Sequence, residues 1–290
     1  MIRRFFLLFL AFLFILALGA GTFYLSYKRT VSEDDPSDKQ QQNSDTQLTS
    51  TTKEQFSFAV IGDTEVDTDS DNNVFKSAIK DINKQKVPFV IHTGDLTAEG
   101  SRDQFRIFDK LLEDLIPSIY PTIGNNDIYT DKSGYNFELF YDNPYYSFDY
   151  EDRHFIILDN SSAYYGFEWK QQEWLKEDLI LNDGKKLILV MHRPLNVPNA
   201  DLVLEGGNEL SDSNIQTFLK IIDPYKDKIE QIFTGHIHDF LQYKLGDIPV
   251  TVTGGGGGEP QFEFVKAEPH YLLVKVYTDK IKIEKKEIRL

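Results

Sequence analysis

Short hydrophobic runs separated by amphipathic stretches dominate the chain from residue 55 onward. The runs are almost continuously apolar, which is typical of strands buried on both faces of a parallel sheet. They lie at 56–61, 87–92, 119–123, 187–191 and 229–233. The stretches between them have helical spacing and lie at 72–84, 101–116, 168–181 and 211–222. This alternation predicts an α/β fold, in which Ser101 and either Ser211 or Asp212 are the N-caps of two helices.

The remaining patterned segments predict further strands. Residues 145–159 contain two strand-like runs separated by Glu151 and Asp152, which is typical of a hairpin. The tail at 261–290 alternates between apolar and polar residues, as strands do. We therefore expect residues 55–290 to form one domain.

The N-terminal segment has the pattern of a membrane helix. Residues 5–27 carry no charge and follow Arg3 and Arg4, and about 20 apolar residues span a bilayer as a helix. Residues 1–29 are thus predicted to be a cytoplasmic stub and an uncleaved signal-anchor helix, with the rest of the chain outside the cytoplasm at the cell membrane. The alternative is a signal peptide cleaved near Ala20, which would release a secreted protein. Residues 30–54 are rich in Ser, Thr, Gln and Asp, and this composition predicts a disordered linker.

Charge and cysteine content narrow the possible partners. The formal net charge is −15, and no acidic residue precedes position 30, so the remainder of the chain is more acidic still. Such a charge repels nucleic acid, which is therefore not expected as a partner. The chain has no cysteine, which excludes disulfides and thiolate metal sites. A phosphorylated substrate remains compatible, because bound dications would reverse the charge locally.

Polar motifs follow the predicted strands. They are Gly62-Asp63-Thr64-Glu65, Gly94-Asp95, Gly124-Asn125-Asn126-Asp127, Met191-His192-Arg193-Pro194, Gly235-His236-Ile237-His238 and the glycines 254–258. In open α/β sheets, ligands bind beyond the carboxyl ends of the strands, where these motifs are expected. Carboxylate, amide and imidazole groups together can hold two divalent metals. Pairs of metals commonly catalyse nucleophilic displacement at phosphorus. The glycine run lacks the Lys-Ser/Thr of a P-loop and is interpreted as backbone passing close to the metal loops.

The ordered set of motifs resembles the calcineurin-like metallophosphoesterase superfamily over roughly residues 56–277. The residues that match that family in order and type are Asp63, Asp95, Asn125, Asp127, His192, His236 and His238. The resemblance implies a four-layer α/β/β/α sandwich with a dinuclear centre at one sheet edge. It also implies that the enzyme is a hydrolase of phosphate ester or anhydride bonds.

The same resemblance implies a division of the ligands between the two metals. Asp95 would bridge both metals, with Asp63 and His238 on one metal. Asn125, His192 and His236 would bind the other. A hydroxide shared by the two metals would then attack phosphorus. Asp127 would orient Asn125 or a histidine, and the metals could be Mn, Fe, Zn or Mg.

Glu65 occupies a position where the family has histidine. As a ligand it would add an anionic oxygen, which favours Mn, Fe(II) or Mg relative to Zn. We predict this ligation, and the alternative is that Glu65 points into solvent.

Asn126 replaces the family histidine to which leaving-group protonation or phosphate contact is assigned. An asparagine can donate a hydrogen bond but cannot release a proton near neutral pH. We therefore expect a preference for activated phosphoesters or phosphoanhydrides, whose leaving groups need little protonation. Arg193 could bind a phosphate oxygen or form a structural salt bridge, and it completes the predicted catalytic set with Asn126 and Asp127.

Several other residues are interpreted as structural. His92, His154 and His270 lie in strand-like runs and are predicted to be packed side chains. An aromatic cluster is expected to be mostly core, and its members are Tyr141, Tyr145, Tyr146, Phe148, Tyr164, Tyr165 and Trp169. Residues 199–210 are expected to form a mobile loop near the site.

Three functions fit the sequence. The first is a membrane-tethered, metal-dependent phosphohydrolase. The second is a phosphodiesterase acting on lipid head groups or envelope polymers, and the third is a catalytically weakened metal-binding or scaffold protein. Metal analysis combined with a nitrophenyl phosphate assay would separate the third function from the other two.

Overall fold

The computed structural model describes residues 53–198, 210–259 and 268–290. The predicted membrane helix, all but the last two residues of the predicted linker, and residues 199–209 of the predicted mobile loop lie outside these ranges. Among the described residues, no helix combines the length and hydrophobicity that a membrane crossing requires. The first strand begins at Glu54, one residue before the predicted start of the domain.

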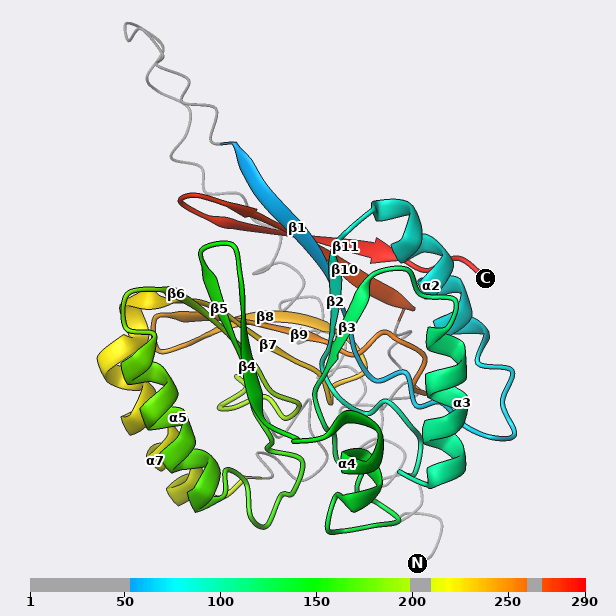
Figure 1. Ribbon diagram of the computed structural model, residues 1–290, viewed down its shortest axis with the longest axis horizontal. Helices are drawn as coiled ribbons and strands as arrows, with labels where there is room; N and C mark the ends of the chain where they lie inside the picture. Colours follow the sequence, from blue (N-terminus) through cyan, green and yellow to red (C-terminus); the bar gives the residue numbers. More distant parts are fainter. Residues whose placement is uncertain (1–52, 199–209, 260–267) are drawn as a thin grey trace, which may run out of the picture. The chain divides into compact units, whose positions relative to one another are not determined.

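The first sheet has five strands in the order β11-β10-β1-β2-β3 (Figure 1). Strands β1 (Glu54–Ile61), β2 (Phe89–His92) and β3 (Ser118–Pro121) are parallel. Strands β10 (His270–Tyr277) and β11 (Ile281–Glu287) extend the sheet in antiparallel pairing from β1. Residues 270–287 thus contain the further strands that the alternating tail predicted.

The second sheet has six strands in the order β4-β5-β6-β7-β9-β8. Its parallel centre consists of β5 (Arg153–Ile157), β6 (Lys186–Val190), β7 (Ile229–Thr234) and β9 (Ile248–Thr253). Strand β4 (Tyr146–Tyr150) pairs antiparallel with β5, which confirms the predicted hairpin. Strand β8 (Phe240–Leu245) pairs antiparallel with β9 at the other edge.

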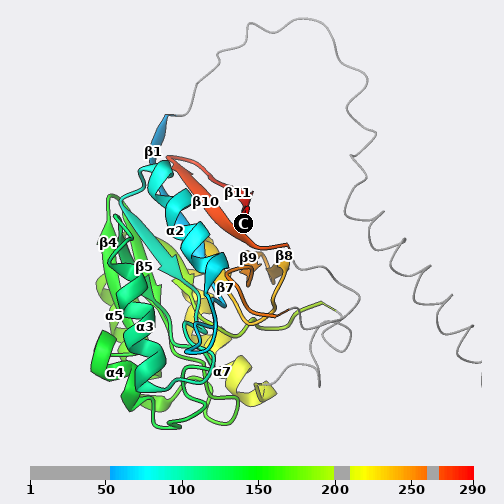
Figure 2. The same cartoon turned by 90° about the vertical axis from the view of Figure 1, so that its right-hand side faces the viewer.

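Helices cover the outer face of each sheet. Helices α2 (Asn73–Gln85) and α3 (Arg102–Leu112) pack on the first sheet and lie in front of it in Figure 2. The short helix α4 (Tyr135–Tyr141) joins the same apolar cluster through Phe137. Helices α5 (Trp169–Leu181) and α7 (Asp212–Ile222) cover the second sheet, and a 3₁₀ turn, η2 (Asp223–Lys228), connects α7 to β7.

The two sheets pack face to face through a third apolar cluster. Phe58 and Phe89 of the first sheet contact Phe155 of the second in edge-to-face geometry, with ring centroids 5.4 Å apart in both pairs. All three rings are essentially buried, and removing them from water is a major source of stability. The layers therefore run helix, sheet, sheet, helix, as the family resemblance implied.

Most predicted elements are confirmed, with shifted ends. Helix α3 ends at Leu112 rather than residue 116, and Ser101 begins it with a capping box. Ser211 is the N-cap of α7 and accepts from the backbone amide of Asn214, so the alternative N-cap, Asp212, is instead the first residue of the helix. Helix α4 and the β8-β9 hairpin were not predicted. The turn of that hairpin contains Gly246 with φ +64°, a conformation that favours glycine.

The aromatic cluster is only partly core. Phe148 packs between the sheets, with its ring stacked 4.8 Å from that of Phe155. In contrast, Tyr164, Tyr165 and Trp169 are 85%, 59% and 69% exposed. The prediction of a mostly buried cluster therefore holds for Phe148 but not for these three side chains. Tyr164 and Tyr165 lie in the surface segment between β5 and α5, and Trp169 is the first residue of α5.

Candidate metal centre

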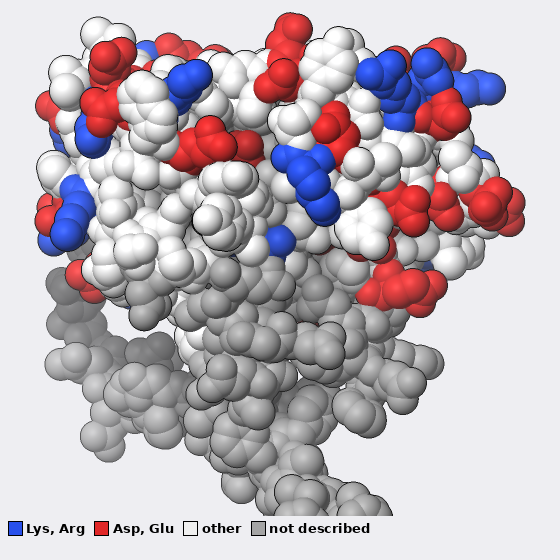
Figure 3. All heavy atoms as spheres, turned by 90° about the horizontal axis from the view of Figure 1, so that it is seen from below, with Lys and Arg blue, Asp and Glu red and all other residues white. Residues whose placement is uncertain are grey.

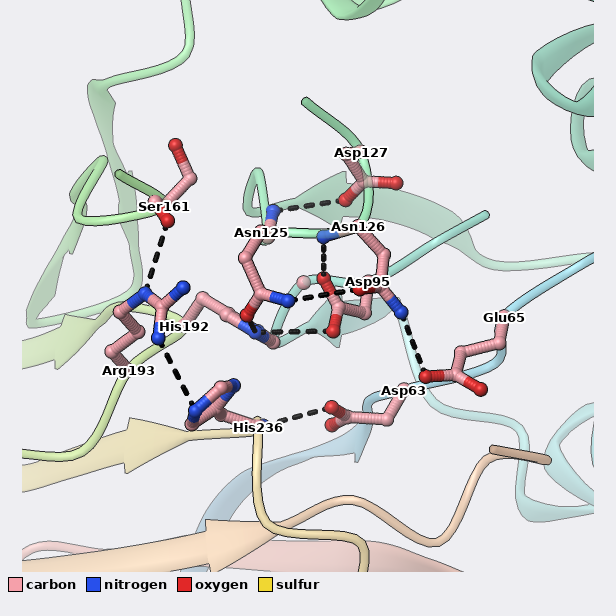
Figure 4. A network of polar contacts seen from close by, with 12 residues as sticks. Asp63, Glu65, Asp95, Asn125, Asn126, Asp127, Ser161, His192, Arg193 and His236 are labelled. Carbon is pink, nitrogen blue, oxygen red and sulfur yellow. Dashed lines mark hydrogen bonds and ion pairs between the residues drawn. The ribbon is translucent and has the colours of Figure 1, made fainter. Parts of the chain in front are cut away.

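Loops that follow β1, β2, β3, β6 and β7 converge at the same edge of the two sheets (Figure 4). Backbone hydrogen bonds hold them together, including Asp63 N–H to the Gly94 carbonyl at 2.9 Å and Gly235 N–H to the His192 carbonyl at 2.9 Å. These bonds join loops that are far apart in sequence. The site is therefore built on paired backbone at the strand ends rather than on free loops.

Four predicted ligands have a left-handed backbone. Their φ angles are +56° for Asp63, +43° for Glu65, +52° for Asp95 and +72° for His236. Residues other than glycine rarely adopt this conformation, which costs of order 1–3 kcal/mol each. Such strain is concentrated at functional sites, where the surrounding structure imposes it. Here it sets the direction in which each of these side chains leaves its loop.

Asp95 belongs to two groups of potential metal ligands. One group contains Asp95, His192 and His236, and the other contains Asp63, Asp95 and His238. Within each group, the ligand atoms lie within 4.8 Å of one another. This is the division of ligands that the family resemblance implied, with Asp95 common to both. Burial raises the pKa of Asp95 to about 6, which shows that the free carboxylate is costly without a cation nearby.

His192 provides the first indication that a cation fits. Its Nδ1 lies 2.9 Å from the Thr93 carbonyl oxygen, to which only a protonated nitrogen can donate. Burial lowers the pKa of this histidine to about 3, so the ring is neutral and Nε2 has a lone pair. That lone pair faces Asn125 Oδ1 at 2.9 Å and Asp95 Oδ2 at 3.3 Å. Three electron-rich atoms that converge without a proton between them suit a bound cation.

The Asp63 side provides the second indication. Asp63 Oδ1 accepts from the His236 amide at 2.8 Å, whereas Oδ2 is buried and has no hydrogen-bond partner among the described residues. Burial raises the pKa of Asp63 well above its usual value. An unpartnered carboxylate oxygen inside a protein is expensive, and a metal would satisfy it.

His238 completes this side. Its Nε2 lies 3.5 Å from Asp63 Oδ1 and 3.3 Å from Glu65 Oε1, while Nδ1 hydrogen-bonds the Glu259 carbonyl. Burial alone would lower the pKa of His238, but the hydrogen bond to Glu65 and the charges of Asp63 and Glu65 raise it to about 10. The ring thus lies against the carboxyl groups of Asp63 and Glu65, and a dication at this position would take the place of the imidazole proton.

Glu65 faces the cluster rather than solvent. Its Oε1 accepts from Asn126 Nδ2 at 2.8 Å and lies beside His238, and its side chain is 20% exposed. The solvent-pointing alternative is therefore wrong for the described structure. Glu65 does not belong to either group of potential ligands around Asp95, although its Oε1 lies 3.3 Å from His238 Nε2, and its ligation stays a prediction.

Asp127 is a buried anchor between loops. Its carboxylate accepts from the amides of Leu96 at 3.2 Å, Thr97 at 3.0 Å and Gly124 at 2.9 Å, and from the Thr97 hydroxyl at 2.9 Å. These bonds join the Asp95 loop to the Asn125 loop. They replace the predicted contact with Asn125 or a histidine, since two oxygens that accept four bonds are fully used. Asp127 thus holds the two loops together, and its predicted part in catalysis stays a prediction.

Arg193 lies beside the predicted ligands. Its Nη1 donates to His236 Nε2 at 3.3 Å and its Nε donates to the Ser161 carbonyl at 3.0 Å. Asn160 holds the Arg193 backbone through two hydrogen bonds, at 2.8 and 2.9 Å. Burial lowers the pKa of Arg193 to about 10, so the guanidinium stays charged at neutral pH. Sequence reasoning missed Asn160 and Ser161, although their position just after the β5 strand end was a usable signal.

The three histidines interpreted as structural have structural contacts. His92 Nδ1 accepts from the Gly94 amide at 3.3 Å, and Nε2 therefore donates to the Thr64 hydroxyl at 3.0 Å. His154 lies between Asp149 and Asp178, and His270 contacts Thr253 and the Glu268 carbonyl. Both ring nitrogens are engaged in each case, which confirms the prediction.

Charged side chains of both signs lie on the described part of this face of the domain. Figure 3 views the face that lies below in Figure 1, and there Lys and Arg are interspersed with Asp and Glu among wide uncharged areas. The buried carboxylates at the metal centre add to a chain of net charge −15. Cations at the site would offset this charge for an incoming phosphate.

Comparison with known proteins identifies the class. Residues 56–240 match the calcineurin-like phosphoesterase family, which is most of the chain, and the protein belongs to that family. The members of this family are metallophosphoesterases, with Asp and His groups that hold two metals.

One relative and two solved structures show how far the likeness extends. The chain is 27% identical over 165 residues to a probable glycerophosphodiester phosphodiesterase, GpdQ, of Arcobacter nitrofigilis. That match covers 53% of this chain and 58% of the relative. In structure, the chain is similar to a dimetal phosphatase from Danio rerio, with a TM-score of 0.63, 14% identity, and 82% and 98% of the two chains covered. It is also similar to a purple acid phosphatase from yellow lupin, Lupinus luteus, with a TM-score of 0.60, 17% identity, and 80% and 51% covered. At these identities the two structures support the fold alone.

Proposed function

We propose that this protein is a metal-dependent phosphohydrolase that cleaves phosphoester or phosphoanhydride bonds at a dinuclear centre. The ligands would be those of the two groups that share Asp95, together with Asn125 and Glu65. The observation that carries the proposal is the Nε2 lone pair of His192, which faces Asp95 and Asn125 with no proton to share. When bound, two divalent cations supply an acidified water and neutralise the charge of the phosphoryl group.

The chain's own residues would orient the reaction. Asp95, which belongs to both groups of potential ligands, would hold the two cations next to each other. Arg193 presents a charged guanidinium next to His236, where its charge can attract a phosphoryl oxygen. Ser161 fixes the direction of that guanidinium. As a ligand, Glu65 would add an anionic oxygen beside Asp63 and His238. Such hard oxygen ligands favour Mn, Fe(II) or Mg relative to Zn.

The preferred substrates would have good leaving groups. Asn126 cannot supply a proton, and both ends of its amide are engaged, with Glu65 and with Asn125. The phosphate released from a phosphoanhydride and the phenolate released from an aryl ester can leave without that proton, whereas the alkoxide of an alkyl ester leaves poorly without it. We expect the kcat/KM for nitrophenyl phosphate or pyrophosphate to exceed that for a simple alkyl phosphate. Equal values would contradict this preference.

A phosphodiesterase is the second candidate. The match to the Arcobacter relative supports it, although the match spans little more than half of that protein. Turnover of bis(nitrophenyl) phosphate and of glycerophosphodiesters, compared with nitrophenyl phosphate, would decide between monoester and diester chemistry. Two bound metals with no turnover of any ester would instead indicate the binding or scaffold protein.

We further propose that the catalytic domain is tethered outside the cytoplasm by residues 5–27. The uncharged stretch after Arg3 and Arg4 supports this placement. Protease treatment of intact cells followed by membrane fractionation would test it. Digestion of the domain while a cytoplasmic marker survives is expected, and a soluble, protected chain would contradict it.

A further inference from the structure

Asn126 and Glu65 stand where the family pattern has histidines, and the structure joins the two replacements. Asn126 Nδ2 donates to Glu65 Oε1 at 2.8 Å across the loops after β3 and β1 (Figure 4). We propose that Asn126 is a positioning residue that couples the two halves of the metal centre, because it fixes Glu65 on one half and Asn125 on the other. The proposal rests on the dinuclear centre of the proposed function and not on hydrolysis.

The direction of the hydrogen bonds gives the coupling its physical basis. A carboxylate only accepts hydrogen bonds, so Glu65 requires Asn126 to present its amino group. The oxygen of the same amide then faces Asn125, whose Nδ2 donates to it at 2.9 Å. Asn125 therefore presents its oxygen to His192 Nε2, at 2.9 Å. The charge of Glu65 thus determines, through Asn126, which atom Asn125 offers to the cluster.

This direction matters because an amide binds a cation through its oxygen. With its amide reversed, Asn125 would present hydrogens toward the metal position and repel the ion. If Asn126 lost its contact with Glu65, either orientation of Asn126 and of Asn125 would become available. The successive contacts His238–Glu65, Glu65–Asn126, Asn126–Asn125 and Asn125–His192 form what we call the relay. It connects one half of the metal centre to the other.

The backbone of Asn126 has a separate role. Its N–H donates to Asp95 Oδ1 at 2.8 Å and holds the shared carboxylate. Replacement of the side chain by alanine keeps this bond, since it belongs to the main chain. The variant N126A therefore tests the relay without removing support for Asp95. The side chain of Asn126 is only partly buried, so N126A is expected to fold.

The test is a double-mutant cycle on the full-length protein in detergent, with Mn²⁺ binding measured by calorimetry. We expect N126A to weaken Mn²⁺ binding about 10- to 100-fold, as loss of a partner that orients a ligand does. The double variant E65A/N126A should bind within about twofold of E65A alone, because Asn126 can orient Asn125 only while Glu65 fixes the direction of the Asn126 amide. The variant N126D keeps the shape but places a carboxylate against Glu65, and should bind more weakly than N126A.

The matched control is Asn143→Ala, which replaces an exposed asparagine in the loop before β4. It should leave Mn²⁺ affinity unchanged, and the double variant with E65A should bind Mn²⁺ as E65A alone does. The electron paramagnetic resonance spectrum of the Mn²⁺-loaded protein gives a second readout. Wild type should show a spin-coupled pair, and N126A should show more of the uncoupled signal.

Three results would overturn the coupling. They are wild-type affinity in N126A, additive losses in E65A and N126A, and a wild-type chain that binds fewer than two Mn²⁺ ions. Two bound ions without hydrolysis would contradict the proposed function alone, and the cycle would still decide the role of Asn126.

Discussion

Asp95 Oδ2 lies 3.3 Å from His192 Nε2, although Asp95 follows a strand of the first sheet and His192 follows a strand of the second. The contact therefore closes the site across the two sheets. It depends on the packing of the sheets and on the strained turn at Asp95. Both residues are almost fully buried, so their contact is well shielded from solvent.

Removal of the shared carboxylate charge should disable the centre. We expect D95N to lower kcat/KM by at least about 100-fold and to reduce the bound metal below two ions per chain, because a neutral amide bridges cations poorly. Metal analysis by mass spectrometry, together with nitrophenyl phosphate kinetics, measures both effects. Wild-type turnover in D95N would contradict the role of Asp95.

A methyl group at Gly124 should damage the site by steric overlap. A Cβ there would lie 2.2 Å from Asp95 Oδ1 and from the Asp95 amide nitrogen. We expect G124A to lose stability by about 1–3 kcal/mol and to lose metal affinity, since backbone and carboxylate must shift. G184A is the matched control, because a Cβ at Gly184 meets nothing within 4 Å. Denaturant melts of both variants should therefore differ, and equal stability would argue against tight packing at Gly124.

Conversion of Arg193 to lysine should not preserve activity. Arg193 donates to both Ser161 and His236 through different nitrogens, and a lysine has no planar fork to do so. We expect R193K to lower kcat/KM on the order of 10²-fold with two metals still bound. A drop in metal content equal to the drop in activity would show instead that Arg193 supports the ligands.

Stability should depend on pH through His154. Burial opposes its charge, but the hydrogen bonds to Asp178 and Asp149, both at 2.7 Å, outweigh it and raise the pKa of His154 above its usual value. Lys185 also faces this cluster, through Asp149. A histidine with a raised folded pKa stabilises fully below its unfolded pKa, near 6.5, and this stability is lost as pH rises through the folded pKa.

The variant D178N isolates this contribution. We expect it to lower the free energy of unfolding by about 1–3 kcal/mol at pH 6 and by less at pH 9. D149N is the matched control and should cost less, because the Asp149 side chain is 51% exposed and that of Asp178 is 11% exposed. A cost that does not change between pH 6 and pH 9 would mean that His154 is not the titrating group.

Chelation should lower both activity and thermal stability. Metals that bind the folded state alone stabilise it by about 2.7 kcal/mol at a free concentration of 100 times Kd. Treatment with a chelator should therefore lower Tm, and addition of Mn²⁺ should restore it. An unchanged melting curve would argue against metals as part of the folded protein.

Strand ends were the most predictable part of the molecule. The apolar runs before Asp63, Asp95 and His192 show where parallel strands finish, and parallel strands bring the loops at their carboxyl ends to one edge of the sheet. Helix α4 escaped prediction because it is seven residues long and starts after Gly134, which has φ +76°. Propensity carries little information over so short a segment.

The contacts within the site were less predictable than its members. Spacing identified Glu65 and Asn126 as departures, but their hydrogen bond depends on how the β1 and β3 loops meet in space. Likewise, the Gly-Asn-Asn-Asp motif drew attention to Asp127 but could not show that it accepts four hydrogen bonds from neighbouring loops. Long-range backbone geometry, which a sequence pattern does not encode locally, fixes these partners.

The most direct test of the dinuclear centre is anomalous diffraction from crystals of the Mn²⁺-loaded protein. We expect two peaks about 3.5–4 Å apart, both bound by Asp95, with His192 beside one and His238 beside the other. A single peak, or two peaks that do not share Asp95, would contradict a dinuclear centre bridged by this carboxylate.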